Sequence, residues 1–161
     1  MKDISAIFRL VFISPECLII VGGLAMVYAF PQECIWLSQR IGQQPEVLKY
    51  SWLLPAGLFG YDVKIVKSIV FPDADKNTLL QKWERYGELK YATMVGLVYG
   101  FGFSVAGVVA MLLDWKAPGA HHSATLLVAV IGALVVSITF FLAQIRIEEL
   151  FREHMGRKSG G

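Results

Sequence analysis

The longest apolar stretches of the chain lie in its second half, on either side of a short turn. Residues 91–113 are 23 consecutive residues without a charge, and residues 124–145 are another 22. Each stretch is long enough for a helix that crosses a bilayer core about 30 Å thick. The residues between them include Pro118 and Gly119, which favour a reversal of the chain. The pattern therefore predicts a transmembrane helical hairpin.

A third apolar stretch covers residues 10–30 and is interrupted only by Pro15 and Glu16. Its 21 residues predict another membrane span. A secretory signal peptide is the alternative, because Lys2 and Arg9 precede the stretch and Val27 and Ala29 suit a cleavage site, but Asp3 and Glu16 are out of place in such a peptide. We therefore expect a membrane helix that the protein retains.

A fourth stretch, residues 50–70, begins as an apolar run and then acquires Asp62, Lys64 and Lys67. Its uninterrupted part is too short to cross a bilayer. The segment completes a crossing if the two lysines extend to the lipid headgroups, and otherwise it lies in the interface or re-enters. The pattern leaves these three arrangements open.

The distribution of basic residues is the usual guide to topology, because cytoplasmic loops are rich in Lys and Arg. With three spans the external basic residues are Lys2, Arg9 and Lys116, and with four they are Arg40, Lys49 and Lys116. The two models therefore place the same number of basic residues outside the cytoplasm. Lys2 and Arg9 flank the first span closely, which favours four membrane-embedded helices with both termini in the cytoplasm, in a bacterial inner membrane.

Composition supports an integral membrane protein that is all-α and forms a single domain over residues 1–161. Hydrophobic residues make up 55% of the chain and charged residues only 17%, where a soluble domain has about a quarter. The net charge is +2 and the mean hydropathy is +0.54. These values argue against disorder, a disulfide-rich miniprotein and a nucleic-acid partner, and they make the lipid bilayer the expected environment.

Small residues recur at every fourth position along both helices of the hairpin. In residues 91–113 they are Ala92, Gly96, Gly100 and Ser104, and in residues 124–145 they include Ala129, Ala133 and Ser137. Such rows let helix backbones approach closely, which is what makes association in lipid favourable. The two rows either pack on each other within one chain or face another subunit, and we expect a homo-oligomer.

Glu16 is the only ionisable residue well inside a strong apolar stretch, where a charge costs roughly 3 kcal/mol. One interpretation is an ion or proton site or a polar contact between subunits. In the other, which we favour, Ser14 caps the helix, Pro15 is its first residue and Glu16 meets the positive end of the helix dipole. Residues 3–14 would then lie along the membrane surface.

Two segments are expected in the cytoplasm. Residues 76–90 predict an amphipathic helix that carries Trp83 and Tyr86 and lies at the membrane surface or docks a partner. Residues 146–158 continue the last helix, with Leu150 and Phe151 on its apolar side. An apolar stripe outside the bilayer has to be covered, so these four residues are candidate contacts.

No catalytic or metal-binding motif is present, so we expect no catalytic residue, no cofactor and no metal. The predicted function is that of a non-enzymatic oligomeric membrane subunit, which anchors or senses at the membrane and couples to a cytoplasmic protein partner. The alternative is a homo-oligomeric pore that permeabilises or depolarises the membrane.

Overall fold

The computed structural model describes the backbone of residues 14–71 and 86–159, and the side chains of these residues as far as Glu149. The described chain is helical and contains no strand. The helices are α2 (Pro15–Ala29), α3 (Pro31–Gly42), α4 (Pro45–Ser51), α5 (Leu53–Val70), α7 (Tyr86–Leu112) and α8 (Ala120–Ser159). The all-α class predicted from the sequence is therefore confirmed.

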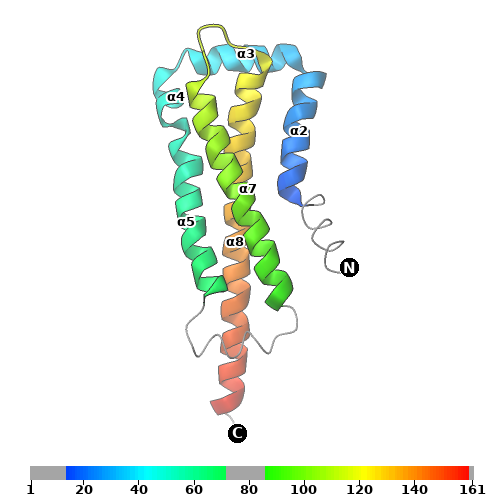
Figure 1. Ribbon diagram of the computed structural model, residues 1–161, viewed down its shortest axis with the longest axis vertical. Helices are drawn as coiled ribbons and strands as arrows, with labels where there is room; N and C mark the ends of the chain where they lie inside the picture. The colour runs from blue at the N-terminus through cyan, green and yellow to red at the C-terminus, as the bar shows by residue number, and fades with distance from the viewer. Residues whose placement is uncertain (1–13, 72–85, 160–161) are drawn as a thin grey trace.

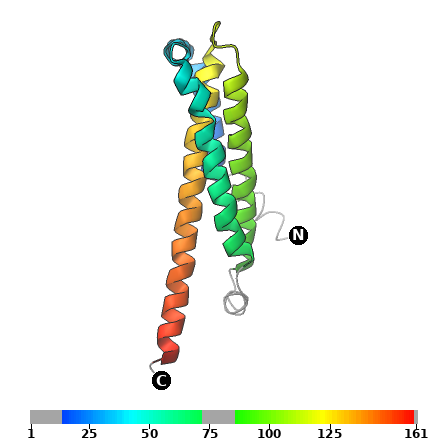
Figure 2. The same ribbon diagram turned by 90° about the vertical axis from the view of Figure 1, so that its left-hand side faces the viewer.

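The helices α5, α7 and α8 pack together along their length, and α2 packs on another side of α8 (Figures 1 and 2). Helix α3 crosses one end of this arrangement and contacts the first turns of α8. The core lies between α5, α7 and α8. Its buried residues are Ile65, Val66, Ile69, Val70, Phe103, Ala133, Val136, Phe140 and Ile147.

Prolines set the starts of α2, α3 and α4. Pro15, Pro31 and Pro45 each occupy the first turn, where the missing N–H is no loss and the fixed φ suits a helix. A proline also disfavours the helical conformation of the residue before it. The chain accordingly leaves the helix at Phe30, with φ −133° and ψ 55°, and α3 runs at 103° to α2.

Within the described residues, α7 and the Ala120–Glu149 part of α8 are each long and apolar enough to cross a membrane. A third crossing is present if α2 and the bent α3 together count as one broken span. The prediction of four embedded helices is thus confirmed only for two or three of them. The segment 50–70 does form a helix, α5, but its three charged residues keep it outside this group.

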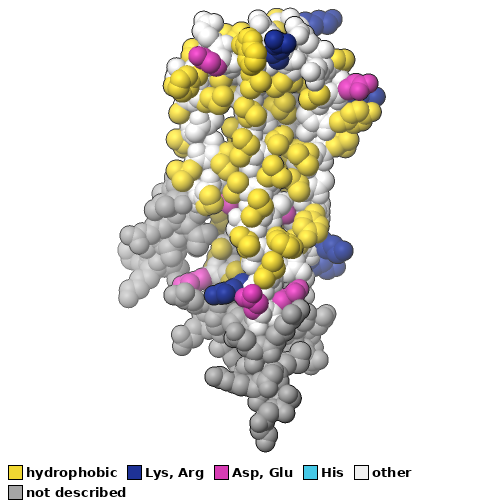
Figure 3. Space-filling model, turned by 180° about the vertical axis from the view of Figure 1, so that it is seen from behind, with side chains coloured by type: hydrophobic (Ala, Val, Ile, Leu, Met, Phe, Trp, Pro, Cys, Tyr) yellow, Lys and Arg dark blue, Asp and Glu magenta, His cyan; other side chains and the backbone are white. Residues whose placement is uncertain are grey.

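The outer surface is apolar over most of its height. In the view of Figure 3, hydrophobic side chains cover the middle of the described part, and most Lys, Arg, Asp and Glu side chains lie nearer its two ends. Helix α7, for example, exposes Val98 to 72% and Leu112 to 72%. Such a surface suits a hydrocarbon solvent and agrees with the membrane class predicted from composition.

Two parts of the structure differ from the expectation or fall outside it. Residues 31–49, for which no helix was predicted, form α3 and most of α4, and Tyr50 and Ser51, which were expected to begin the helix at 50–70, instead complete α4. The predicted helix at 76–90 lies largely outside the described residues, and its last five residues form the first turn of α7. Helix α8 continues past the bundle to Ser159, so the tail predicted at 146–158 is helical.

Candidate functional site

A carboxyl group lies at the centre of the contact between α5, α7 and α8. The side chain of Asp62 is only 1% exposed. Its Oδ2 atom accepts a hydrogen bond of 3.0 Å from the Ser137 hydroxyl of α8. Its Oδ1 atom is buried and has no hydrogen-bond partner among the described residues. A buried acceptor without a partner is unusual in a folded protein, and this one marks the candidate site.

The position of Asp62 on α5 explains its burial. Ile65, Val66 and Ile69 follow it at spacings of three, four and seven residues, so all four side chains share the face that packs on α7 and α8. Lys64 and Lys67, by contrast, are exposed. The amphipathic pattern of α5 therefore places a carboxyl group where an apolar side chain is the rule.

Gly100 of α7 forms the wall opposite the carboxyl group. A Cβ atom added there would lie 3.4 Å from Cγ1 of Val136 and 3.8 Å from Oδ2 of Asp62, which is ordinary van der Waals contact. The α7 backbone at this point thus lies about one methyl group away from the side chains of α5 and α8. One turn further on, the Ser104 hydroxyl lies 3.0 Å from the carbonyl oxygen of Pro55 and fixes α7 to α5.

Charges that would pair with this carboxyl group are missing from the helices that enclose it. Helix α7 has no Asp, Glu, Lys, Arg or His between Lys90 and Leu112, and α8 has none between His122 and Arg146. The salt bridge found among the described residues, Arg146 to Glu149, is exposed. An ionised carboxylate in so apolar an enclosure is costly, so this residue calls for a functional explanation.

Most of the predicted small-residue positions turn inward within one chain. Gly96, Gly100, Ser104, Ala129, Ala133 and Ser137 are buried, and Ala92 is half-buried. A Cβ atom added to Gly96 would lie 2.9 Å from Cε1 of Phe140, so this glycine makes room for an α8 side chain. Of this set, Ser137 touches Asp62 directly and Gly100 lies beside it.

The start of α2 has the arrangement favoured from the sequence. The Ser14 hydroxyl accepts a hydrogen bond of 3.2 Å from the Cys17 N–H, Pro15 is the first helical residue and Glu16 lies in the first turn. Glu16 is 5% exposed and lines a cavity of about 280 Å³ between α2, α7 and α8. The cavity walls include Thr93, Gly96, Val136, Thr139 and Phe140. Glu16 therefore lies at the N-terminal end of α2 and also faces residues of α7 and α8.

The remaining predicted contact residues are only partly placed. Trp83 lies outside the described residues, and Leu150 and Phe151 belong to α8 without a described side chain. Tyr86 is half-buried, and its hydroxyl donates a hydrogen bond of 3.2 Å to the carbonyl oxygen of Ile69. This bond ties the start of α7 to the end of α5.

A second polar cluster joins α3 to the start of α8 and had no clear signal in the sequence. The Ser38 hydroxyl donates to the Gly119 carbonyl and accepts from the Ser123 N–H, both at 3.0 Å. The Ser123 hydroxyl in turn donates to the Cys34 carbonyl at 2.8 Å. Ser38 and Ser123 are fully buried. The cluster is satisfied internally, so it serves to hold α3 across the bundle.

The sequence matches no family model, no curated protein and no solved structure. Among the described residues, no group of three or more His, Cys, Asp or Glu side chains is placed to hold a metal ion. The features that bear on function are therefore the buried carboxyl group of Asp62 and the length of α8.

Proposed function

We propose that the protein is a non-enzymatic integral membrane subunit, whose bundle anchors it in the bilayer and whose α8 extension docks a cytoplasmic protein partner. The observation that carries this proposal is the length of α8. This helix runs unbroken for 40 residues, from inside the apolar bundle to an end that projects beyond α5 and α7 (Figures 1 and 2). A rigid helix of this kind transmits displacement between the bilayer and a bound protein.

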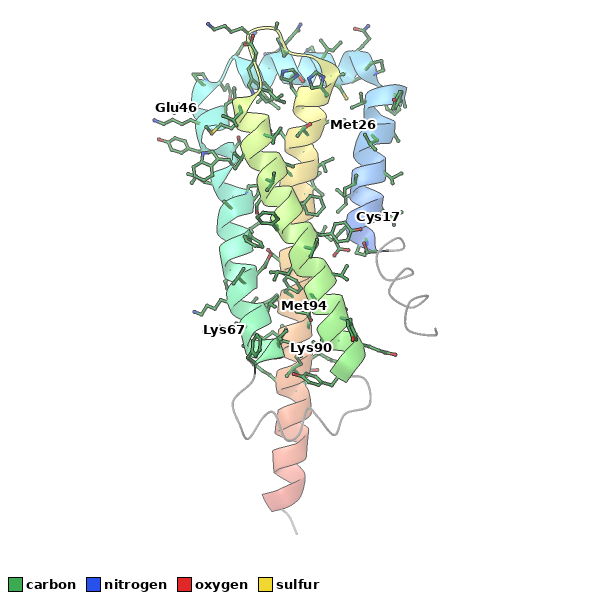
Figure 4. The ribbon with its side chains drawn as sticks, in the orientation of Figure 1. Cys17, Met26, Glu46, Lys67, Lys90 and Met94 are labelled. Atoms are coloured by element: carbon green, nitrogen blue, oxygen red, sulfur yellow. The ribbon has the colours of Figure 1, made fainter. Side chains whose placement is uncertain are left out.

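In this proposal α5 is a fourth embedded helix. Asp62 is enclosed by protein and does not face lipid, so it does not carry the full cost of a charge in hydrocarbon. Lys64 and Lys67 lie toward the end of α5 that is nearer the α8 extension, and Figure 4 shows Lys67 extending outward. Long lysine side chains at such a level reach the headgroup region.

Four crossings place both termini on one side of the membrane. Helix α5 ends and α7 begins near the end of the bundle from which α8 projects, whereas α2 begins part of the way along the bundle and runs toward the opposite end, where α3 lies (Figure 1). The segments between α5 and α7 and after Ile145 hold most of the basic residues in the second half of the chain. Because basic loops tend to stay inside, we infer that this side is cytoplasmic, and we propose a bacterial inner membrane as the location.

Homo-oligomer formation is part of the proposal, with the exposed apolar surface as its contact. The alternative function, a pore, would need polar or small residues on the outside of each copy. Gly96, Gly100, Ser104 and Ala133 already pack inside one chain, which takes them away from any shared axis. We therefore favour the subunit over the pore.

The test is site-specific photo-crosslinking in native membranes of the expressing cell. A photoreactive residue at Phe151 should yield a discrete protein adduct, while the same group at Val98, which is 72% exposed on α7, should yield lipid or self-adducts. Lipid adducts alone at both positions would contradict a protein partner. Single-channel conductance of the purified protein in planar bilayers would instead support the pore.

A further inference from the structure

We propose that Asp62 is a proton-binding site, which the bundle holds as a neutral carboxylic acid and which loosens the contact between α5 and α8 when its proton leaves. This inference rests on the burial of Asp62 between three helices. It does not depend on a cytoplasmic partner.

The need for a neutralising ligand follows from the surroundings of Asp62. The other titratable side chains on α5 are Tyr61, Lys64 and Lys67, those on α7 are Tyr86, Glu88, Lys90, Tyr91 and Tyr99, and α8 has no acidic, basic or histidine side chain between His122 and Arg146. All three lysines are exposed, whereas Asp62 is buried. Among the described residues, no cationic side chain therefore pairs with the carboxylate. A buried carboxylate without such a partner is neutralised by binding a proton.

A proton fits this site better than a metal cation does. Metal cations that prefer oxygen are coordinated by about six or more ligand atoms, so a metal site needs an open space among these ligands. Here one carboxylate oxygen is already bonded to Ser137, and the Ser104 hydroxyl is directed at the carbonyl oxygens of Pro55 and Gly100. The cavity beside Glu16 reaches Val136, but Asp62 and Ser137 are not among its lining residues.

Ser137 suits both protonation states. A hydroxyl donates one hydrogen bond and also accepts, so it donates to Oδ2 of the carboxylate and accepts from the O–H of the acid. In the second case its own hydrogen is free to bond the carbonyl one turn earlier in α8, as serines in helices commonly do. The contact between Asp62 and Ser137 therefore survives protonation with its direction reversed.

The loss of the proton acts on the packing of the bundle. It leaves an ionised group whose Oδ1 atom has no donor, directly beside the backbone of α7 at Gly100. Water is the solvent that satisfies such a group, and water enters only if α5 separates from α7 and α8. Protonation of Asp62 is thus coupled to how tightly α5 is held.

The first test measures the carboxyl group in the intact protein, reconstituted in phosphatidylcholine and phosphatidylglycerol vesicles. Infrared difference spectra between acid and alkaline buffer should contain the C=O band of a protonated carboxylic acid. The same band should still be present in samples at pH 7. Asp62→Asn should remove this band, and Glu16→Gln, the matched change at the other buried acid, should leave it. A wild-type spectrum without this band at pH 7, or a band that Glu16→Gln alone removes, would overturn the proposal.

A second test needs no variant. A hydrophobic carbodiimide accepts the proton of a carboxylic acid on nitrogen, and the carboxylate oxygen adds to its central carbon to leave a stable adduct after rearrangement. Peptide mapping should find the adduct on Asp62, with a yield that falls at least several-fold as pH rises. Protection by Na⁺ at constant pH would show a cation site instead, and no adduct on Asp62 at any pH would also contradict a protonated carboxyl group.

Discussion

Gly23 of α2 lies directly against Val128 of α8, so that a Cβ atom added to this glycine would collide with Cγ2 of the valine. Gly22, the residue before it, has open space where its Cβ atom would be. The two glycines therefore form a matched pair on one helix. Their contrast shows which face of α2 packs on the bundle, a distinction that the apolar sequence of this helix does not make.

We expect Gly23→Ala to destabilise the packing of α2 by about 1–3 kcal/mol, because a methyl group has to displace a side chain in a packed interface. Gly22→Ala should change stability by less than about 1 kcal/mol, in the direction set by the higher helix propensity of alanine. Unfolding in mixed detergent micelles, followed by circular dichroism, measures both. Equal effects of the two changes would contradict the packing of α2 on α8.

Ser38 supplies a second prediction, because its hydroxyl stands between the Gly119 carbonyl and the Ser123 N–H in the first turn of α8. Ser38→Ala should cost about 1–3 kcal/mol, the usual penalty for leaving buried polar groups without their partner. Hydrogen exchange of the α3 amides should become faster. Ser51→Ala is the control, since the Ser51 hydroxyl bonds only the Leu48 carbonyl of its own helix, and a similar loss in both variants would rule out a special role for Ser38.

His122 is expected to be neutral, with its hydrogen on Nε2. Its Nδ1 atom accepts a hydrogen bond of 3.0 Å from the Gly119 N–H, which a protonated Nδ1 cannot do. Its Nε2 atom lies 3.2 Å from the Asp114 carbonyl, which requires a donor. Nitrogen-15 chemical shifts of the imidazole at neutral pH identify this tautomer, and a pattern with hydrogen on Nδ1 would contradict the turn geometry.

An element of this structure could be predicted from the sequence where local composition determines it, and could not where long-range contacts do. The helices at 91–113 and 124–145 were predictable, because length and lack of charge suffice to identify them. Helices α3 and α4 were missed, since the polar residues of 31–51 mix with apolar ones and only Pro31 and Pro45 signal the starts. The placement of α3 depends on buried serines that bond residues more than 80 positions away.

The candidate site likewise could not be predicted from local sequence alone. Glu16 was a candidate because it interrupts an apolar run, whereas Asp62 was named only as one of three charged residues that follow the apolar run of residues 50–70. Its burial depends on the packing of α7 and α8 against α5, with Ser137 and Gly100 beside the carboxyl group. The signal that was present is its spacing from Ile65, Val66 and Ile69, which puts it on the apolar face of α5.

The last prediction concerns the crossing by α5, and Glu46 and Lys67 lie near its two ends (Figure 4). In a background with Cys17→Ser and Cys34→Ala, Glu46→Cys and Lys67→Cys should react with a membrane-impermeant maleimide from opposite sides of sealed vesicles. Lys67→Cys should react from the side that carries the α8 extension, because a helix of 18 residues is about 27 Å long and nearly spans the hydrocarbon core.

The matched controls for this crossing are Lys116→Cys and Lys90→Cys, which bracket α7, a helix long and apolar enough to cross. Glu46→Cys should follow Lys116→Cys, and Lys67→Cys should follow Lys90→Cys. If both α5 positions react from the side of Lys90→Cys, the segment re-enters or lies at the surface, and only the crossings by α2, α7 and α8 remain. Three crossings would put the start of α2 and the end of α8 on opposite sides of the membrane, which contradicts the proposed topology.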